Sequence, residues 1–448
     1  MMSSAAYGIG DIELYVPRFR MDLETLAAER IKADPAMERH FGRALAVTGQ
    51  RALRFPAVGQ DSATMAAEAA YNLLTHNSGK ALANLRFLAA GTETGVDHSK
   101  PLSAYVQGML QSSGLPLPNN LASFQVQHAC AGATMALLSS AGMLAASGRD
   151  ETGLILASDI ARYSLHSTAE ITQGAGAAAV LVEKNPRLLE IDLSNIGFYS
   201  SDVDDFFRPL GSTTAKVKGT YSMQCYNQSL DETLLDLAQR LGTAPADLLA
   251  DTDFVALHTP FRNMPEMAMK KLLATHLELD EPAAIGWLEE RGFYKGVDPV
   301  SEIGNSYTAS VFFCIAYLLK DRWQRLGDQI IGKKLLIASY GSGNIMTLIR
   351  ATVAANAPHI IERWQLPDLK HDFIPATMAD YQHWTSDNVA SYGECSQVRR
   401  TDLRFRLSGV RADGYREYTH ENCAGNSQPT QGQASGHLQP SGTLPHRE

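Results

Sequence analysis

Cys130 stands where a predicted strand runs through a turn of small residues into a predicted helix. Residues 124–127 alternate apolar and polar side chains, and residues 135–138 read Met-Ala-Leu-Leu, which favours a helix. A cysteine at a helix start lies near free N–H groups and the positive end of the helix dipole, and both favour the thiolate. We therefore interpret Cys130 as a candidate nucleophile, with a buried structural cysteine as the alternative for this residue taken alone.

Three further polar residues occupy the ends of predicted elements and would complete a thiol-dependent site. Glu93 follows the buried strand predicted at 85–91. His258 ends the strand predicted at 253–258, and Asn305 opens an apolar helix. A thiolate needs a neighbouring base or cation, and acyl transfer needs hydrogen-bond donors for the carbonyl oxygen. Taken singly, the three have simpler explanations, namely a surface carboxylate, a turn histidine and a helix cap.

The two halves of the chain repeat one order of elements. In the first half, a strand leads to Glu93, a turn and helix follow at Cys130, and another strand comes next. In the second half, a strand leads to His258, a turn and helix follow at Asn305, and another strand comes next. We infer a duplicated βαβ unit, whose pseudo-twofold axis would gather these four side chains around one cleft.

The composition narrows the class of protein. The chain has 448 residues, 45% of them apolar, and a net charge of −9 without a basic cluster, so we expect no nucleic-acid partner. The first residues lack the features of a signal peptide, and the longest apolar run, at 309–319, is too short to span a membrane. We therefore expect a soluble, cytoplasmic enzyme that does not bind a membrane.

The cysteines point away from disulfides and metal sites. They stand at positions 130, 225, 314, 395 and 423 and form no CxxC pair. His128 and Cys130 lack further ligands at the spacing of a zinc site, so we expect no metal. Gly174-Ala175-Gly176 leads into a predicted strand rather than a helix, which is the wrong context for dinucleotide binding.

Strands that alternate with helices predict an α/β protein. Asp22 is a predicted N-cap, and Ser62 or Asp61 is predicted to cap the next helix. Residues beyond about 353 are expected to form a helix followed by irregular sequence. We divide the chain into an N-terminal half (1–187), a C-terminal half with an extension (188–421) and a tail (422–448). The tail is dominated by Gly, Ser, Gln and Pro, so we expect it to be disordered.

With these residues in place, the chain resembles the 3-hydroxy-3-methylglutaryl-CoA (HMG-CoA) synthases, a family with the thiolase fold. The resemblance runs from about residue 8 to 352 and keeps the order of the family's motifs. Its segments are 91–100, the Cys130 turn, 157–163, 172–177, 205–209, 221–226, 258–261, 304–310 and 339–343. The resemblance implies a layered αβαβα fold built from two pseudo-repeated halves.

The resemblance also implies an acyltransferase reaction that belongs to the mevalonate pathway of isoprenoid synthesis. Cys130 would be acetylated by acetyl-CoA, and Glu93 would take a proton from the acetyl methyl group. The resulting carbon would attack the ketone of acetoacetyl-CoA, with His258 polarising and protonating the ketone oxygen. Hydrolysis of the thioester to Cys130 would free HMG-CoA. No cofactor is needed beyond the two acyl-CoA substrates, and family members suggest a homodimer.

Further site residues follow from the same motifs. Asn305 and Ser342 would contact acyl oxygens, and the glycine turn at Gly341 would offer backbone N–H groups to a bound carbonyl. Asp159, Tyr163 and Tyr307 would orient the reacting groups. Many relatives carry a lysine after the histidine motif that is linked to CoA binding. This chain has Arg262-Asn263 there, so Arg262, Lys270 or Lys271 is expected to face the CoA phosphates.

A second departure keeps other activities open. Many relatives have tyrosine directly after the nucleophile, but this chain has Ala131, which is the residue found in ketoacyl synthase III enzymes. This difference leaves the shape of the acyl pocket undecided. A synthase that takes acetyl from an acyl-carrier protein for polyketide β-branching is the nearest alternative. A ketoacyl synthase III-like enzyme has no need of Glu93. A non-catalytic acyl-CoA-binding scaffold is the remaining alternative, and it would not need Glu93, Cys130 or His258.

Overall fold

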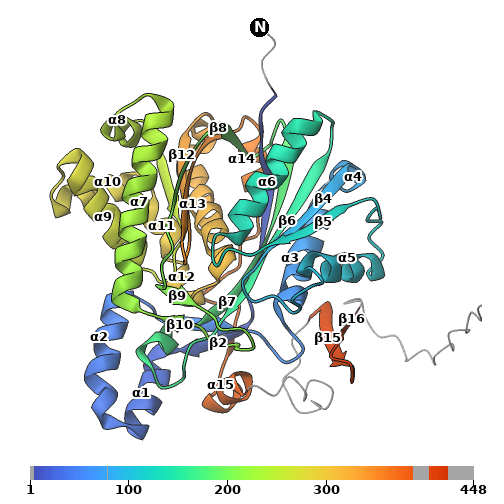
Figure 1. Ribbon diagram of the computed structural model, residues 1–448, viewed down its shortest axis with the longest axis vertical. Helices are drawn as coiled ribbons and strands as arrows, with labels where there is room; N and C mark the ends of the chain where they lie inside the picture. Colours follow the sequence, from blue (N-terminus) through green and yellow to red (C-terminus); the bar gives the residue numbers. More distant parts are fainter. Residues whose placement is uncertain (1–4, 78, 387–402, 422–448) are drawn as a thin grey trace, which may run out of the picture.

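A mixed sheet of nine strands dominates the computed structural model, which describes residues 5–77, 79–386 and 403–421 (Figure 1). From one edge to the other its strands are β11 (Phe254–Leu257), β12 (Lys334–Gly341), β13 (Ile345–Val353), β8 (Leu189–Ser200), β1 (Tyr7–Tyr15), β7 (Gly174–Lys184), β6 (Thr152–Ala161), β4 (Leu85–Gly91) and β5 (Ala122–Val126).

The same pairing pattern occurs on both sides of the junction between β1 and β8. In the first half β4 is parallel to β6, and β6–β7 and β7–β1 are antiparallel. In the second half β11 is parallel to β12, and β12–β13 and β13–β8 are antiparallel. The predicted duplication is therefore present in the strand order. The domain boundary placed at 187 falls between β7 and β8 and stays a prediction, because one sheet continues across it.

Alternate side chains of the strands are buried on both faces of the first half. Leu154 and Leu156 of β6 pack into one hydrophobic cluster with α3 (Ser62–His76) and α5 (Leu102–Ser112). Ile155 and Ala157 point the other way, into the cluster that contains α6 (Gly132–Ser147). Burial on both faces explains why these strands read as continuous apolar runs in the sequence.

Two helices form an inner layer between the halves. Helix α13 (Ser310–Leu326) contacts β11 and β12 as well as β1 and β7, and α6 contacts β8 in addition to its own half. Helix α7 (Gly219–Leu241) covers β8 and β13. Figure 1 shows the resulting order of helix, sheet, helix, sheet and helix from left to right. The α/β fold with αβαβα layers is confirmed.

The inner helix α6 is also strongly apolar. Within the described ranges, Ala129–Ser147 alone is long and apolar enough to cross a membrane, and 56% of this apolar stretch is buried inside the protein. Its place between the two halves accounts for this composition.

Helix starts follow the predicted caps. The Asp22 carboxylate accepts the N–H of Thr25 at the start of α1 (Leu23–Ala33). Asp61 accepts the N–H of Thr64 in α3, and the Thr64 hydroxyl in turn accepts the N–H of Asp61. The cap at Asp22 is confirmed, and of the two alternatives for α3 the structure has Asp61 rather than Ser62.

The region expected to be irregular after residue 353 contains a hairpin. Strands β15 (Phe405–Val410) and β16 (Arg416–His420) pair with each other and lie against α3 and α5. The Glu68 carboxylate of α3 accepts the N–H groups of Arg404 and Phe405, at 2.7 and 2.9 Å. These contacts lie far apart in sequence, so local pattern does not predict them. The tail predicted at 422–448 lies outside the described residues.

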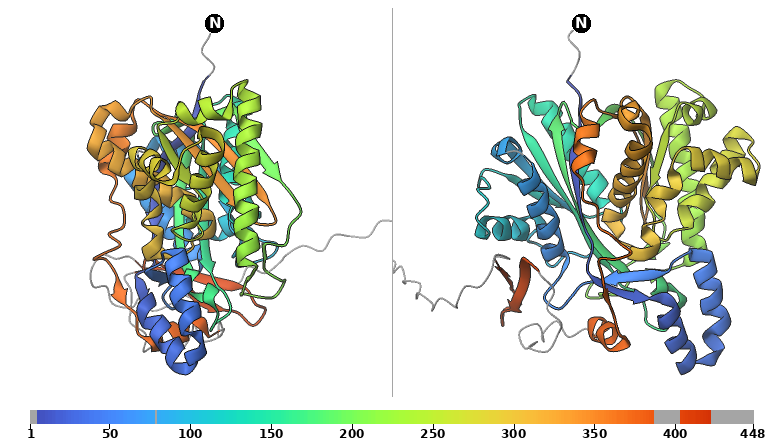
Figure 2. Two further views of the ribbon diagram at one scale, coloured as in Figure 1. Left: turned by 90° about the vertical axis from the view of Figure 1, so that its left-hand side faces the viewer. Right: turned by 180° about the vertical axis from the view of Figure 1, so that it is seen from behind.

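The remaining elements surround the layers. Figure 2 shows α1 and α2 (dark blue) and α15 (orange) at the same end of the molecule. The elements are β2 (Phe19–Asp22), α2 (Glu38–Thr48), β3 (Ala52–Phe55), α4 (Gly79–Ala83), β9 (Phe206–Phe207), β10 (Lys216–Val217), α8 (Pro245–Ala250), α9 (Met264–Leu277), α10 (Glu281–Glu290), α11 (Phe293–Val297), α12 (Val300–Ile303), α14 (Ala357–Arg363), β14 (Ile374–Pro375) and α15 (Met378–Thr385).

Candidate active site

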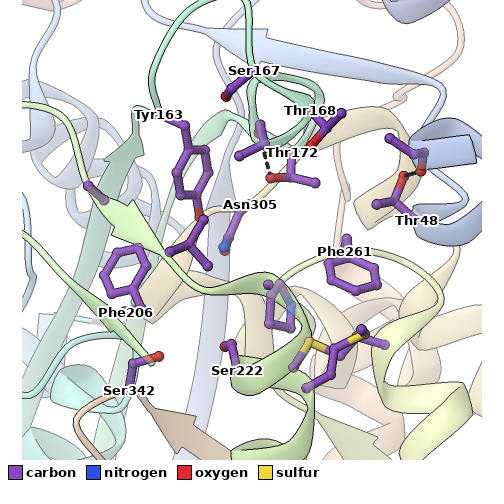
Figure 3. A pocket seen from close by; sticks show the side chains of 18 of the residues that line it. Thr48, Tyr163, Ser167, Thr168, Thr172, Phe206, Ser222, Phe261, Asn305 and Ser342 are labelled. Atoms are coloured by element: carbon purple, nitrogen blue, oxygen red, sulfur yellow. Dashed lines mark hydrogen bonds between the residues drawn. The ribbon is translucent and has the colours of Figure 1, made fainter. Parts of the chain in front are cut away.

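A cavity of about 730 Å³ opens where the two halves meet. Cys130 and Tyr163 of the first half line it together with His258, Asn305 and Ser342 of the second. Figure 3 shows Tyr163, Phe206, Asn305 and Ser342 around this space. The pseudo-repeat therefore brings Cys130, His258 and Asn305 to one cleft, as the order of elements in the sequence suggested. In the described structure Glu93 does not line the cavity and reaches the site through its contact with Cys130.

The turn at Cys130 is held by close backbone packing. Ala129 has φ 41°, and the N–H of Ala131 donates to the carbonyl of His128 at 3.0 Å before α6 begins. A Cβ atom at Gly341 would lie 2.4 Å from that same carbonyl oxygen, so only glycine lets β12 approach the turn. Gly341 thus shapes the nucleophile's turn, and in the described structure it does not line the cavity.

Cys130 donates a hydrogen bond from its thiol to the Glu93 carboxylate. The Sγ–Oε1 distance is 3.2 Å, and Cys130 is buried. Burial and the neighbouring Glu93 raise the pKa of the thiol well above its usual value. The expectation that the helix start favours the thiolate is therefore wrong for the free enzyme. Desolvation and a like charge outweigh the helix dipole, and the sulfur must lose its proton during the reaction.

Glu93 is placed to accept that proton. Burial raises the pKa of its carboxyl to about 7, while the guanidinium of Arg208 opposes this rise. Arg208 Nη2 lies 3.0 Å from Glu93 Oε2, and Arg208 also donates to the Glu93 backbone carbonyl. A carboxyl with a pKa near neutrality can both take and return a proton near pH 7.

Asp159 fixes the turn that carries Glu93. Its Oδ1 accepts hydrogen bonds from the Thr92 hydroxyl and from the N–H groups of Glu93 and Thr94, at 2.8 to 3.0 Å. Its Oδ2 accepts from the N–H of Thr308, just before α13. Asp159 is fully buried and does not line the described cavity, so it joins the two halves behind the site without touching its open space.

His258 directly follows β11 and is neutral at physiological pH. Burial lowers the pKa of its imidazole to about 3. Its Nδ1 lies 2.6 Å from the Ser310 hydroxyl oxygen, and its ring forms part of the cavity wall. A neutral imidazole acts on a bound carbonyl by donating a hydrogen bond rather than as a cation.

The Asn305 segment turns sharply before α13. Gly304 has φ 82°, and a Cβ there would lie 1.8 Å from the carbonyl oxygen of Gln173. Asn305 Oδ1 accepts the N–H of Tyr307 at 2.9 Å and so closes a local turn. The N-cap residues of the two helical segments that follow are Ser306 and Ala309, so Asn305 is not the helix cap that the simpler explanation proposed. Its amide also interacts with the Tyr163 hydroxyl, which places both side chains at the cavity.

The cations expected to face CoA lie elsewhere. Arg262 forms ion pairs with Glu266 and Asp298, and Lys270 pairs with Glu281 at 2.7 Å. In the described structure neither they nor Lys271 line the cavity. The role of all three in CoA binding stays a prediction, and the ion pairs of Arg262 and Lys270 count against those two residues.

Sequence reasoning gave no role to several residues that the structure places at the site. Arg208 belonged to a quoted motif, and only its distance from Glu93 in space reveals the ion pair. His40 and Arg43 of α2 and Lys216 of β10 line the cavity. No sequence pattern linked these residues to Cys130, because α2 was not predicted.

The duplicated five-layer fold with a buried cysteine at the start of an inner helix is that of the thiolase-type condensing enzymes. Two family models match this chain: the N-terminal hydroxymethylglutaryl-coenzyme A synthase model over residues 4–186 and the C-terminal one over residues 295–380. The chain belongs to the hydroxymethylglutaryl-CoA synthase family.

Individual members of the family are similar to this chain over most of its length. The hydroxymethylglutaryl-CoA synthase of Enterococcus faecalis is 28% identical over 403 residues, covering 90% of this chain and 97% of that one. The Haloferax volcanii synthase is 29% identical over 398 residues, which cover 80% of this chain and 84% of that one. The solved structure of MvaS in complex with 3-hydroxy-3-methylglutaryl coenzyme A superposes with a TM-score of 0.80 at 28% identity, covering 93% of this chain and all of that one.

Proposed function

We propose that this enzyme condenses acetyl-CoA with acetoacetyl-CoA to give HMG-CoA and free CoA, through an acetyl thioester on Cys130. The observation that carries the proposal is the contact between the Cys130 thiol and Glu93, beside a cavity that His258 and Asn305 complete. This product would enter the mevalonate pathway. The E. faecalis and H. volcanii relatives, which carry the name of this activity, support the assignment.

The first step forms the acyl-enzyme. The Cys130 thiol gives its proton to Glu93 as the sulfur attacks the acetyl carbonyl carbon, and the S–C bond to CoA then breaks. The departing CoA thiolate takes the proton back from Glu93, which leaves the carboxylate ready for the next step. The 3.2 Å Sγ–Oε1 distance allows this direct transfer.

The second step forms the new carbon–carbon bond. Glu93 removes a proton from the methyl group of acetyl-Cys130, and the resulting enolate carbon attacks the ketone carbon of acetoacetyl-CoA. The neutral imidazole of His258 donates a hydrogen bond to the ketone oxygen as charge develops there. This oxygen then takes up the proton that Glu93 removed from the methyl group, which gives the product hydroxyl and returns Glu93 to the carboxylate. Asn305 and Ser342 contact acyl oxygens, and the backbone N–H of Cys130 completes the oxyanion hole. Attack of water on the Cys130 thioester then releases HMG-CoA and regenerates the thiol.

The experiment that tests the function mixes the purified protein with acetyl-CoA and acetoacetyl-CoA. Intact mass of the protein and liquid chromatography with mass spectrometry of the products are recorded together. We expect an acetyl adduct with acetyl-CoA alone and HMG-CoA with both substrates. A relative in Bacillus subtilis, 28% identical over 300 residues, is named a polyketide 3-hydroxy-3-methylglutaryl-ACP synthase. If the acetyl adduct forms only from an acetylated acyl-carrier protein, acetyl-CoA is not the acetyl donor.

Removal of the Arg208 charge should shift the pH dependence of the condensation. The Arg208 guanidinium opposes the rise in the pKa of Glu93, whereas buried Asp159 reinforces it. In Arg208→Gln the pKa of Glu93 therefore rises further, and the acidic limb of the kcat/KM profile moves to higher pH by about one unit. Arg208→Lys keeps the charge and should shift less. An unchanged acidic limb in Arg208→Gln would show that Arg208 does not influence the pKa of the catalytic base.

We propose that Arg43 and Lys216, rather than Arg262 or Lys270, meet the phosphates of CoA. Both line the cavity and both are exposed, one on α2 and the other on β10. Among the described residues the structure gives neither an ion pair, in contrast to Arg262 and Lys270. Unpaired cations at the open side of a cavity suit a phosphate group, which remains near water.

Substitution of these cations should weaken substrate binding without slowing chemistry. We expect the KM for acetyl-CoA to rise about tenfold in Arg43→Gln/Lys216→Gln, with kcat nearly unchanged and a smaller dependence on salt. Arg39→Gln removes an exposed charge from the same helix outside the cavity lining and serves as the control. A larger rise in KM for Arg262→Gln would restore the expectation drawn from the sequence.

We also propose a cytoplasmic homodimer. Strand β5 is an edge strand of the sheet, paired on one side with β4, and most of its residues are half-buried. An edge with free backbone N–H and C=O groups is a natural surface for pairing with a second copy. Light scattering after size-exclusion chromatography should give twice the chain mass of 48.7 kDa. A monomer at micromolar concentration would contradict this.

A further inference from the structure

The hydroxyl of Ser310 is the hydrogen-bond partner of the His258 ring. Ser310 begins α13 and is fully buried, and its Oγ lies 2.6 Å from Nδ1 of His258. Because Nδ1 is engaged in this contact, Nε2 is the nitrogen available to a molecule in the cavity. Which of the two nitrogens carries the proton decides whether the ring can donate to a substrate oxygen.

A second hydrogen bond of Ser310 indicates which nitrogen of the His258 ring carries the proton. The N–H of Thr259 donates to Ser310 Oγ at 3.1 Å, which uses the hydroxyl as an acceptor. The hydroxyl hydrogen then needs an acceptor of its own, and in the described structure Nδ1 is the acceptor within reach. A buried hydroxyl without an acceptor costs free energy. The arrangement therefore has Ser310 donating to Nδ1, which leaves the ring proton on Nε2.

The backbone of His258 itself has two anchors that do not involve Ser310. The N–H of His258 donates to the Ala338 carbonyl at 2.8 Å, and the Tyr226 hydroxyl donates to the His258 carbonyl at 2.8 Å. These contacts anchor the end of β11 and do not touch the imidazole. Loss of the Ser310 hydroxyl should therefore leave both anchors of His258 in place, although it also removes the acceptor of the Thr259 N–H.

We propose that Ser310 is a positioning residue that holds His258 in the tautomer with the proton on Nε2, directed at the ketone oxygen of the acceptor substrate. The kinetic consequence rests on the proposed condensation, whereas the tautomer itself does not. Ser310 acts through His258 and needs no contact with either substrate. Because acetylation of Cys130 does not use the acceptor ketone, Ser310 should matter for the second half of the reaction only.

Nitrogen NMR of protein with 15N-labelled histidine tests the tautomer without any substrate. A difference spectrum against His258→Asn assigns the ring, since the chain has 13 histidines. In the wild type we expect Nδ1 of His258 to resonate as the unprotonated nitrogen and Nε2 as the protonated one. In Ser310→Ala we expect a second tautomer to appear. A protonated Nδ1 in the wild type, or an unchanged spectrum in Ser310→Ala, would overturn the proposal.

Kinetics of the two half-reactions supply the second readout. In Ser310→Ala we expect condensation to fall about tenfold, the effect of one lost hydrogen bond, with Cys130 acetylated at the wild-type rate. Ser140→Ala is the matched control, because Ser140 is a fully buried helical serine whose hydroxyl has no partner in the described structure. Circular dichroism and thermal melting check that both variants fold.

The outcomes separate this inference from the proposed function. Equal condensation rates for Ser310→Ala and the wild type would overturn the inference and leave the function intact. An equal fall in acetylation and condensation would make Ser310 a general structural residue and also overturn it. If the wild type makes no HMG-CoA, the proposed function fails, while the NMR result still decides the tautomer.

Discussion

Replacing Cys130 with alanine is expected to abolish both the acetyl adduct and the formation of HMG-CoA. The sulfur is the only atom in the proposed mechanism that carries the acetyl group, and no water or neighbouring side chain can take over that bond. We expect turnover to fall by at least about 10⁴-fold, as when other covalent nucleophiles are removed. Intact mass after incubation with acetyl-CoA measures the adduct, and mass spectrometry of the products measures turnover.

Cys225 provides the matched control for this experiment. It is a free, buried cysteine on α7 and does not line the cavity in the described structure. Cys225→Ala should keep the adduct and the wild-type rate. An adduct that persists in Cys130→Ala, or one that disappears in Cys225→Ala, would place the nucleophile elsewhere.

Glu93→Gln is expected to stop the condensation while the acetyl-enzyme still accumulates. The glutamine keeps the shape of the side chain but cannot accept a proton. A thiol loses its proton to water far more readily than a thioester methyl group does, so acetylation slows less than carbon–carbon bond formation. We expect HMG-CoA formation to fall by about 10³- to 10⁴-fold, the contribution of a positioned base. Time courses of adduct mass and product report the two steps separately.

Glu13→Gln is the control for burial of a carboxyl group. Burial also raises the pKa of Glu13, to about 8, so this residue is largely protonated at pH 7 and resembles a glutamine already. It lies on β1 outside the cavity lining, and its replacement should leave both steps unchanged. A Glu93→Gln enzyme that makes HMG-CoA at the wild-type rate would assign the base to another group.

The parts of the fold that depend on local pattern were predictable from the sequence. Strands buried on both faces give apolar runs, and caps such as Asp61 act within one helical turn, so their positions follow from short segments. Glu93, Cys130, His258 and Asn305 were recognisable because each stands at the end of an element. The repeated order of elements then placed all four near one cleft.

The parts that depend on long-range contacts were not predictable. The ion pair between Arg208 and Glu93 joins two loops without periodicity, and the hairpin β15–β16 depends on Glu68, more than 300 residues earlier in the chain. The protonation of Cys130 is a further case. A helix start favours the thiolate in general, but only the folded structure shows that the sulfur is buried beside a carboxylate. Ion pairing of Arg262 likewise appears only in three dimensions.

The duplication has a consequence for how such a site can arise. Cys130 and Glu93 come from one repeat, and His258 and Asn305 come from the other. A chain of half this length would hold only one pair and would need the other half, as a separate chain, to complete the set. Joining the two copies in one polypeptide replaces that encounter by a fixed, high effective concentration of each half at the other. The assembled site no longer depends on protein concentration, and each repeat is free to specialise in its own pair of side chains.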